Sequence, residues 1–273
     1  MAKIFFLTTE ITPFANTAGL GDFSAKVPLL LQEKGHDIRT IIPKYGFVSE
    51  RKYILREVIR LREIPFNFDG SEHLASAKSA FIPKTRVQVY FLEHSEWFKP
   101  LSNLLYKSKN GRPYSDNDDR YAFFDTAALA TLPHLFWKPN VIMCNDWQTA
   151  MVPLIYRQVY QEEEFYQGIK TILLVHSMSE YGEFSRGAFE KAGLQLPDSL
   201  TGDSINVLEA ALPVVDKIIA LDTPENNVSA ELMKLNCYQD VEKKMITIAL
   251  EDNSLDAYSR VANSIDQLVQ EDV

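Results

Sequence analysis

The 273-residue sequence has little of what marks several large classes of protein. It has only two cysteines, Cys144 and Cys237, which are too few for a disulfide framework and lack the spacing of a metal site. Two thiols in a chain of this length predict a reducing, cytoplasmic environment. Cys144 follows the apolar run Asn-Val-Ile-Met, which favours a buried, inert thiol over a reactive one.

Long hydrophobic runs and an excess of positive charge are also absent. No apolar stretch approaches the roughly 18 residues that a membrane helix needs, and the N-terminal apolar segment is shorter than the core of a signal peptide. The net charge of −9 argues against a nucleic-acid partner, because phosphate binding requires a basic surface. We therefore expect neither a membrane nor a nucleic acid as partner, and a neutral or small-molecule ligand fits the charge.

The sequence alternates apolar strands with amphipathic helices. Strands are predicted at residues 3–9, 37–43, 140–145, 170–176 and 217–222, and helices at residues 20–34, 117–136, 149–160, 203–215 and 224–235. Residues 56–94 are rich in β-formers and predict a meander or hairpin beside the sheet. The pattern predicts an α/β fold, with one Rossmann-like parallel-sheet domain at residues 1–235, a β-rich insertion, and a helical tail at residues 236–273 that packs on the domain or extends it.

A glycine-bearing loop, Asn-Thr-Ala-Gly-Leu-Gly-Asp, follows the first predicted strand. Its pattern is neither G-x-G-x-x-G nor a P-loop, which argues against a dinucleotide site. Gly19 and Gly21 permit positive φ and close approach of a ligand at the carboxyl end of the strand, where open α/β sheets bind ligands. A turn that serves only the strand-to-helix geometry explains the same glycines, and the loop alone favours neither explanation.

Polar and aromatic residues follow two further predicted strands and begin one helix. Carboxylates and amides form paired hydrogen bonds with vicinal hydroxyls, and aromatic faces pack on the C–H side of a pyranose ring, so this composition is typical of a sugar site. These residues are Asn145, Asp146, Trp147 and Gln148, then His176, Tyr181 and Gly182, and at the helix start Asp116, Asn117 and Arg120.

Each of these residues also has a purely structural explanation. Asp146 is a possible cap of the following helix, and Asn117 and Asp118 are possible N-caps of theirs. Trp147 is equally suited to anchor the core, and His176 to be a buried histidine with its hydrogen bonds satisfied. Their joint position at the carboxyl ends of the strands favours a functional explanation more than any one of them does.

In their order along the chain, these motifs resemble the bacterial-type glycogen and starch synthases. That family transfers glucose from ADP-glucose to the non-reducing end of an α-1,4-glucan. The resemblance spans about residues 3–231 and is carried by the segments TTEITPFANTAGLGDF, GHDIRTIIPKYG, DNDDRYAFF, KPNVIMCNDWQTAMVP, VHSMSEYGEF, INVLEAAL and DKIIALDTP. It implies the N-terminal half of a two-domain GT-B glycosyltransferase, with an α-glucan or maltooligosaccharide and ADP-glucose as ligands.

The resemblance also implies roles for matching residues. Asp146 and His176 border the family's cleft where the transferred glucose meets the acceptor, and we predict them as catalytic residues. We expect no metal and no cofactor. The predicted substrate-binding residues are Asn16, Thr17, Gly19, Gly21, Asp22, Asn117, Arg120, Asn145, Trp147, Gln148, Tyr181 and Gly182.

Several positions depart from the family pattern. Asn16 stands where the family has a lysine that contacts the donor phosphate. Met143 and Asn145 replace two histidines, and Glu180 and Tyr181 stand where the family has Tyr and Gln. Because a positioned electrostatic group typically contributes on the order of 10²–10³ in rate, these changes put transfer by the chain alone in doubt.

The length of the chain also departs from the family. Family members are nearly twice as long, and their second domain holds most of the donor-nucleotide site. Nothing after residue 231 predicts another Rossmann unit, since a βαβ unit takes about 30 residues or more. The chain thus resembles the acceptor-side half alone.

Three functions fit this sequence. The first is a glucosyltransferase that works with a separate C-terminal half or as a homo-oligomer. The second is a catalytically degenerate protein that binds α-glucan or a nucleotide sugar and regulates glycogen metabolism. The third is an unrelated small-molecule enzyme on the same scaffold.

Overall fold

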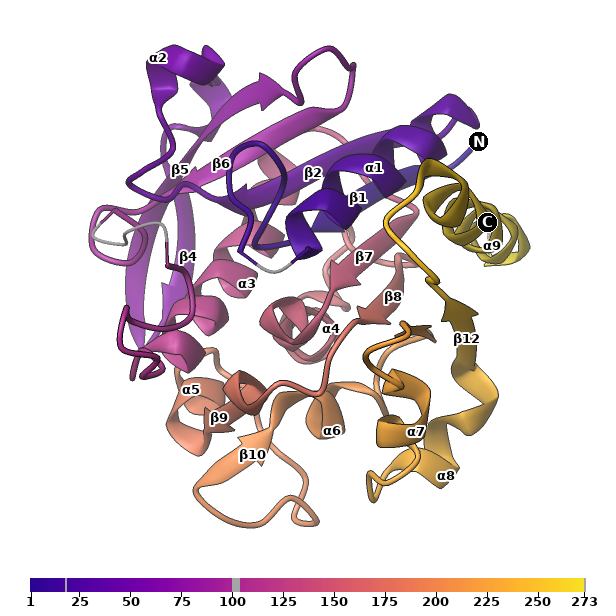
Figure 1. Cartoon of the computed structure of the whole chain (residues 1–273). Coiled ribbons are helices and arrows are strands. Elements are labelled where there is room, and N and C mark those ends of the chain that lie inside the picture. The colour runs from indigo at the N-terminus through magenta and orange to yellow at the C-terminus, as the bar shows by residue number, and fades with distance from the viewer. Residues whose placement is uncertain (18, 100–103, 273) are drawn as a thin grey trace.

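The structure is a computed structural model that describes residues 1–17, 19–99 and 104–272. Its strands are β1 (Lys3–Leu7), β2 (Asp37–Pro43), β3 (Arg56–Glu57), β4 (Ile64–Phe68), β5 (Ser71–Phe81), β6 (Gln88–Glu93), β7 (Val141–Asn145), β8 (Lys170–Val175), β9 (Glu183–Ser185), β10 (Ser204–Asn206), β11 (Lys217–Asp222) and β12 (Met245–Ala249). Ten described strands form one sheet in the order β12-β11-β8-β7-β1-β2-β6-β5-β3, with β4 paired to β5 (Figure 1). The strands from β12 to β6 run parallel, and β5 is antiparallel to β6.

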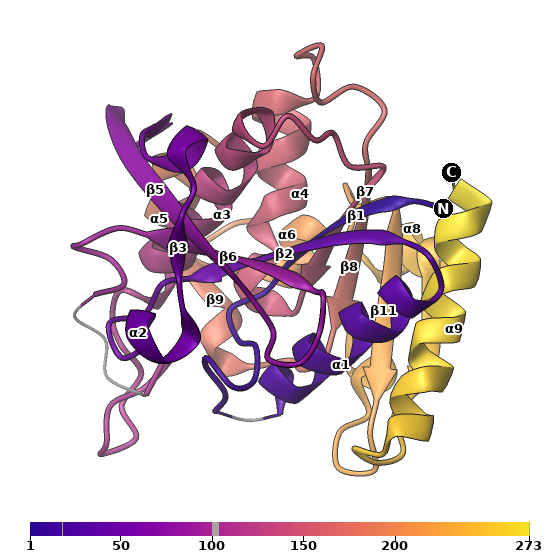
Figure 2. The ribbon, with the colours of Figure 1, turned by 90° about the horizontal axis from the view of Figure 1, so that it is seen from above.

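The helices lie on both faces of this sheet. They are α1 (Leu20–Glu33), α2 (Glu50–Tyr53), α3 (Asn117–His134), α4 (Met151–Ile155), α5 (Arg186–Lys191), α6 (Val207–Ala211), α7 (Val228–Leu232), α8 (Tyr238–Val241) and α9 (Leu255–Asp272). Short 3₁₀ turns occur at Ile59–Leu61, Trp147–Thr149, Glu180–Gly182 and Glu242–Lys244, and a π-helical turn at Tyr156–Tyr160 follows α4. Figure 2 shows α1 and α9 on one side of the sheet and α3 and α4 on the other.

The two layers follow from alternation within continuous apolar strands. In β1, Ile4 and Phe6 pack into the core beneath α1 and α9, while Phe5 and Leu7 belong to the core that includes α3 and α4. A strand covered on both faces reads as an unbroken apolar run, because both sets of its side chains are buried. The predicted α/β parallel-sheet fold is confirmed, and the β-rich insertion extends the sheet through β6 and β5. No helix of the described part of the chain is long and apolar enough to cross a membrane.

The tail differs from the helical prediction in one element. Met245–Ala249 is not helical but forms β12, which pairs in parallel with β11 and extends the sheet. The run Met-Ile-Thr-Ile-Ala has the β-branched composition of a strand, and its shortness hid it among polar residues. Helix α9 then packs on α1 through Val261 and Ile265, and the His36 ring lies 2.8 Å from the Asp266 carboxylate. The tail therefore both extends the sheet and covers one face of it.

Two other predicted helices are shorter than expected. Residues 204–206 are strand β10, and only Val207–Ala211 is helical, with Asn206 as an N-cap whose side chain accepts two backbone N–H bonds. The helix predicted at residues 224–235 begins at Val228, since Thr223 and Asn226 form a bridged turn first. In both cases, hydrogen bonds of a local turn replace the first turns of the helix that the periodicity predicts.

Candidate active-site cleft

A cleft of about 500 Å³ opens at the carboxyl ends of β1, β7, β8, β11 and β12. This is the edge at which open α/β sheets bind their ligands. Three turns that the sequence singled out, after β1, β7 and β8, meet there. Of the predicted site residues, those that line the cleft are Gly19, Asp146, Trp147, Gln148, His176 and Tyr181.

The glycine loop is shaped by its backbone geometry. Gly19 has φ of +89°, and its N–H donates to Oδ1 of Asn16 at 3.2 Å. A Cβ at Gly21 would lie 2.7 Å from the carbonyl oxygen of Ala15, so this approach requires glycine. Gly21 thus serves the turn, whereas Gly19 lines the cleft, where ligand contact stays a prediction.

Other polar residues of the loop are occupied by bonds near it. The Asp22 carboxylate accepts from Thr12 Oγ1 at 2.7 Å, and Thr17 Oγ1 donates to Glu10 Oε1 at 2.8 Å. Glu10 is buried and also accepts from the hydroxyl of Tyr106. Glu10 and Tyr106 both line the cleft, although the sequence analysis did not select them.

Asp146 fixes the turn after β8. Its backbone has φ of +68° and ψ of −177°, a conformation that residues other than glycine seldom adopt. Its carboxylate accepts from the backbone N–H of His176 at 3.0 Å, from that of Ser177 at 3.2 Å, and from the Ser177 hydroxyl at 3.0 Å. Burial raises the pKa of Asp146 to about 6, although these donors oppose the shift. Such contacts are those of a positioning residue, and the catalytic role of Asp146 stays a prediction.

His176 is held in one tautomer by Asn145. The buried Asn145 amide donates from Nδ2 to Thr8 Oγ1 at 3.1 Å and to Ser24 Oγ at 2.8 Å, which leaves Oδ1 to accept from Nε2 of His176 at 2.7 Å. Burial lowers the pKa of His176 to about 3, so the ring is neutral at physiological pH. The edge of Phe23 packs against it at 4.5 Å between ring centroids. His176 therefore offers the cleft a neutral polar ring, and its catalytic role also stays a prediction.

Aromatic rings build one wall of the cleft. The rings of Tyr106 and Tyr181 lie 6.4 Å apart at an interplanar angle of 22°, and Trp147 lies 5.5 Å from Tyr106. A Cβ at Gly182 would lie 3.4 Å from that of Trp147, so Gly182 backs the tryptophan. Trp147 is only 2% exposed, so it is a core anchor as well as part of the lining.

Gln148 brings an unpaired acceptor to the same cleft. It is 3% exposed, and its Oε1 atom is buried with no hydrogen-bond partner among the described residues. A buried acceptor without a partner costs about 1–3 kcal/mol, which a ligand that donates a hydrogen bond would recover. The observation favours a hydroxyl-bearing ligand at this position.

Asn117 and Arg120 are placed elsewhere by the structure. Both are buried on α3, where the Asn117 amide donates to the backbone oxygen of Tyr106 at 2.8 Å, and Arg120 donates to that of Leu105 at 2.9 Å. Arg120 also forms an ion pair with Asp116. Among the described residues that line the cleft, neither is present, and their contacts position Tyr106 instead.

The charges of the cleft have one sign. No lysine or arginine occurs among the described lining residues, and Glu251 is paired with the more distant Arg260 at 2.8 Å. Two of the carboxylates come from the segment between β12 and α9, which the sequence analysis left out of the site. The carboxylates that line the cleft are those of Glu10, Asp146, Glu225, Glu251 and Asp252.

The described part of the chain has no cluster of residues suited to bind a metal ion. Within residues 1–17, 19–99 and 104–272, no group of three or more His, Cys, Asp or Glu residues is arranged to hold a metal ion. The buried thiol of Cys144 lies in the core, where burial raises its pKa well above the usual range.

Comparison with known proteins agrees with this geometry. The family model described as starch synthase catalytic domain matches residues 3–233. The glycogen synthase of Chlorobium luteolum is 32% identical over 79% of this chain and 45% of its own length, and that of Chlorobium limicola is 33% identical over 76% of this chain and 42% of its own. The chain thus spans less than half the length of these relatives.

Solved structures share the fold. The catalytic domain of starch synthase IV from Arabidopsis thaliana, bound to ADP and acarbose, matches with a TM-score of 0.75 and 24% identity over 91% of this chain and 51% of that one. A sucrose-phosphate synthase chain from Thermosynechococcus elongatus matches with a TM-score of 0.50 and 12% identity over 98% of both chains. On the family model and the curated relatives, this chain belongs to the glycogen and starch synthase family of glycosyltransferases.

Proposed function

We propose that this chain binds an α-glucan in the cleft as the acceptor-side half of a glycogen or starch synthase. We further propose that glucosyl transfer from a nucleotide sugar such as ADP-glucose needs cationic groups from a second domain or from a partner, such as a separate half or another copy of the chain. The observation that carries both proposals is the lining of the cleft, which has five carboxylates and, among its described residues, neither lysine nor arginine.

A glucan fits this lining because it can donate hydrogen bonds. Its hydroxyl groups complement the carboxylates and the unpaired Oε1 of Gln148, and its rings complement the wall of Trp147 and Tyr181. A neutral ligand also avoids repulsion by Glu225 and Asp252 at the rim. The same features support a maltooligosaccharide as the simplest ligand to test.

A nucleotide diphosphate does not fit the cleft alone. The leaving diphosphate of a glucosyl transfer needs positioned cations or N–H groups, and each such group is worth on the order of 10²–10³ in rate. Asn16 stands on the loop where the family resemblance places a lysine. Its side-chain oxygen Oδ1 already accepts a hydrogen bond from the backbone N–H of Gly19. Transfer at a useful rate therefore requires positive charge from outside the described lining, supplied by a second domain or a partner.

A purely glucan-binding, regulatory role is the second candidate. It is favoured by the two predicted catalytic residues, because His176 is neutral and the Asp146 carboxylate is occupied by three hydrogen bonds. The two candidates differ in whether any partner restores transfer.

Calorimetric titration of the full chain with maltoheptaose, and separately with ADP-glucose, tests the proposal. We expect the chain to bind glucan without nucleotide. Gln148→Ala should weaken this binding about tenfold, because it removes the side-chain acceptor of a neutral hydrogen bond to the glucan. Gln167→Ala is the matched control, since Gln167 is exposed and bonds to the backbone of Glu162. Tighter binding of ADP-glucose than of glucan would contradict the proposal.

A chain-elongation assay separates the two candidates. ADP-glucose-dependent elongation is measured with the chain alone and with candidate second halves. Elongation only in the presence of a partner supports the synthase role, and glucan binding with no elongation in any combination supports the regulatory role. Robust turnover by the monomeric chain alone would show that no outside cation is needed.

A further inference from the structure

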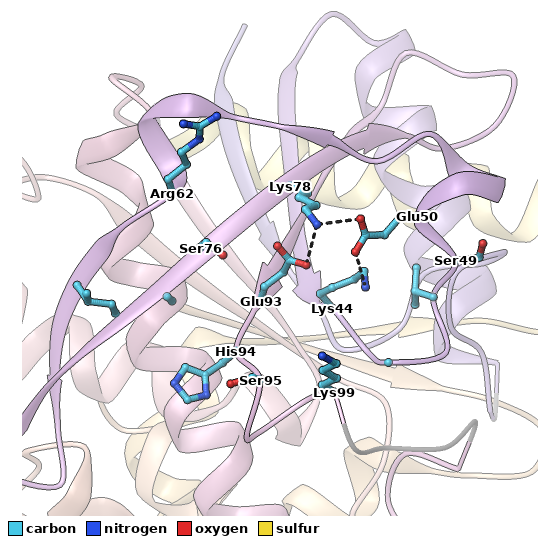
Figure 3. Close-up of a pocket in the computed structure, with 14 residues that line it drawn as sticks. Lys44, Ser49, Glu50, Arg62, Ser76, Lys78, Glu93, His94, Ser95 and Lys99 are labelled. Carbon is cyan, nitrogen blue, oxygen red and sulfur yellow. Dashed lines mark hydrogen bonds and ion pairs between the residues drawn. The ribbon is translucent and has the colours of Figure 1, made fainter.

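A second cavity lies at the same edge of the sheet, on the side of the β-rich insertion. It has a volume of about 750 Å³, which is in the range of small-molecule sites. Lys44 enters it directly after β2, and Glu93 and His94 enter it at the end of β6 (Figure 3). Strand β5, the neighbour of β6 in the sheet, also lines the cavity, and its Ser76 lies directly across from Glu93 in the antiparallel register.

A network of alternating charges lines this cavity. The ammonium of Lys78 lies 2.8 Å from the Glu50 carboxylate and 3.3 Å from that of Glu93, and Lys44 lies 3.4 Å from Glu50. Figure 3 shows these side chains pointing toward one another inside the cavity. Lys44 and Lys78 are held in place, since their side chains are only 11% and 20% exposed. The cations are thus preorganised before any ligand arrives.

The cavity has more positive than negative charge. Besides Lys44 and Lys78 it is lined by Arg62 and Lys99, against the two carboxylates of Glu50 and Glu93. Lys99 forms no ion pair with any residue that the structure describes, and Arg62 pairs only with the exposed Glu57 among those residues. The excess of two positive charges stands out in a chain with a net charge of −9.

Neutral donors complete the lining. The hydroxyl groups of Ser76 and Ser95 lie at the cavity, and Nδ1 of His94 is buried without a hydrogen-bond partner among the described residues. Burial lowers the pKa of His94, so its ring adds hydrogen-bonding capacity rather than charge. Glu50 and Glu93 can accept hydrogen bonds from ligand hydroxyls while they remain paired with lysine.

We propose that this cavity is a binding site for a small phosphate monoester, in which Lys44, Lys78 and Lys99 hold the phosphate group. A phosphate dianion balances the two excess charges, and charge-assisted hydrogen bonds to ammonium groups are the strongest that such side chains form. The carboxylates and serines suit a hydroxyl-bearing remainder such as a sugar. This site is separate from the cleft and does not depend on the function proposed for it.

Calorimetric titration of the full chain at low ionic strength tests the site with three probes. They are a hexose 6-phosphate, inorganic phosphate and the unphosphorylated hexose. We expect both phosphate probes to bind and the hexose not to bind, with affinity falling at high salt. Tighter binding of the hexose phosphate assigns the site to phosphorylated sugars, and equal binding assigns it to free phosphate.

Substitutions of the lysines and of the carboxylates in the network should change the affinity for phosphate in opposite directions. Lys78→Met should weaken phosphate binding about tenfold, as loss of one charge-assisted bond does, and the exposed Lys99→Gln about threefold. Glu93→Gln should tighten binding about threefold, because it removes a repelling carboxylate. A gain in affinity of this kind cannot arise from a partly unfolded variant, so it protects the test if Lys78→Met folds poorly.

Lys52→Gln is the matched control. Lys52 is exposed on α2, two residues from Glu50, and stacks on the ring of Tyr53 rather than facing the cavity. The Lys52→Gln substitution removes one positive charge, as Lys99→Gln does, and should leave phosphate binding unchanged. The proposal is overturned if neither phosphate probe binds, if the hexose binds as tightly as its phosphate, or if Lys52→Gln weakens binding as much as Lys99→Gln does.

Discussion

The cleft and the second cavity are two openings on one edge of the same sheet, and their charges are opposite. The cleft at β1, β7 and β8 is lined by carboxylates and aromatic rings, whereas the cavity at β2 and β6 is lined by three lysines, two of them in ion pairs. Both follow the rule that ligand sites form where parallel strands end. The topology therefore determines where a site can form, and the residues just after each strand determine which ligand charge it accepts.

The two regions also differ in how their polar groups are held. In the cleft, neutral hydrogen bonds fix Asn145 and His176, and packed aromatic rings form one wall, so its shape depends on the core. In the cavity, ion pairs among Lys44, Glu50 and Lys78 fix the side chains near solvent, so its shape depends on charge. Substitutions should therefore affect the two regions separately, with larger effects on stability at the cleft.

The largest expected effect comes from Trp147→Ala. Truncation of a buried tryptophan typically costs about 3–5 kcal/mol in the free energy of unfolding, and here it also removes the aromatic wall. Urea denaturation measures the loss, and calorimetry should show glucan binding abolished while the folded protein still binds phosphate. Phe136→Ala is the control, because Phe136 is 83% exposed and its loss should change stability by less than about 0.5 kcal/mol. Equal effects of the two variants would contradict the contrast.

The next effect is a pH dependence specific to the cleft. The pKa of His176 is about 3 in the folded chain, against an ordinary value of 6.5, so its contribution to stability is present above about pH 6.5 and is lost as the pH falls toward 3. The wild type should therefore lose stability relative to His176→Gln by at most about 1.4 kcal/mol per pH unit below pH 6.5.

Asp146 acts in the opposite direction over part of this range. Its raised pKa of about 6 means that the folded state takes up a proton between pH 6 and the ordinary value of 3.8, which favours folding as the pH falls. Asp146 is present in both the wild type and His176→Gln, so its contribution cancels in the difference between their free energies of unfolding. Denaturation at several pH values then measures the contribution of His176. A constant difference between pH 7 and 4 would show that His176 is not buried as a neutral ring.

A third test supplies the cleft with the charge that it lacks. Asn16→Lys places an ammonium on the loop beside Gly19, at the position where the family resemblance has a lysine. We expect ADP to bind about tenfold more tightly at low salt, since a hydrogen bond to a charged group is worth about 1.5–3 kcal/mol before screening. Gln167→Lys adds the same charge elsewhere and should have no such effect. If ADP binding does not respond, the acidic lining is not what excludes the nucleotide.

Much of the fold and part of the site were predictable from the sequence for one reason. A buried strand reads as an apolar run, so the polar residues that end it are visible, and this placed Gly19, Asp146 and His176 at one edge correctly. Applied more widely, the same rule finds Glu10, three residues after the end of β1, and Asp252, three residues after Met245–Ala249 once that run is taken as a strand.

What the sequence did not disclose depends on distant contacts. Tyr106 lies between β6 and α3 in the sequence, and it is held at the cleft by the bonds that Asn117 and Arg120 donate to the backbone there and by its hydroxyl bond to Glu10. A helix start rich in polar residues suggests a surface, yet Arg120 is 0% exposed because its charge is paired with Asp116. The second cavity was not predicted, because its ion pairs join β5, β6, the short helix α2 and Lys44 after β2, which no local pattern connects.

The smallest effect is expected from Asp252→Asn, and it distinguishes the rim of the cleft from its interior. Asp252 is exposed, so water and salt screen its charge, and removing it should tighten ADP binding by less than about twofold at low salt and not at all at high salt. Glucan binding should not change, because a neutral ligand does not respond to a screened charge. A large gain in ADP affinity would instead mean that the segment between β12 and α9 repels the nucleotide directly, and exclusion would then depend on one rim residue rather than on the absence of cations throughout the described lining.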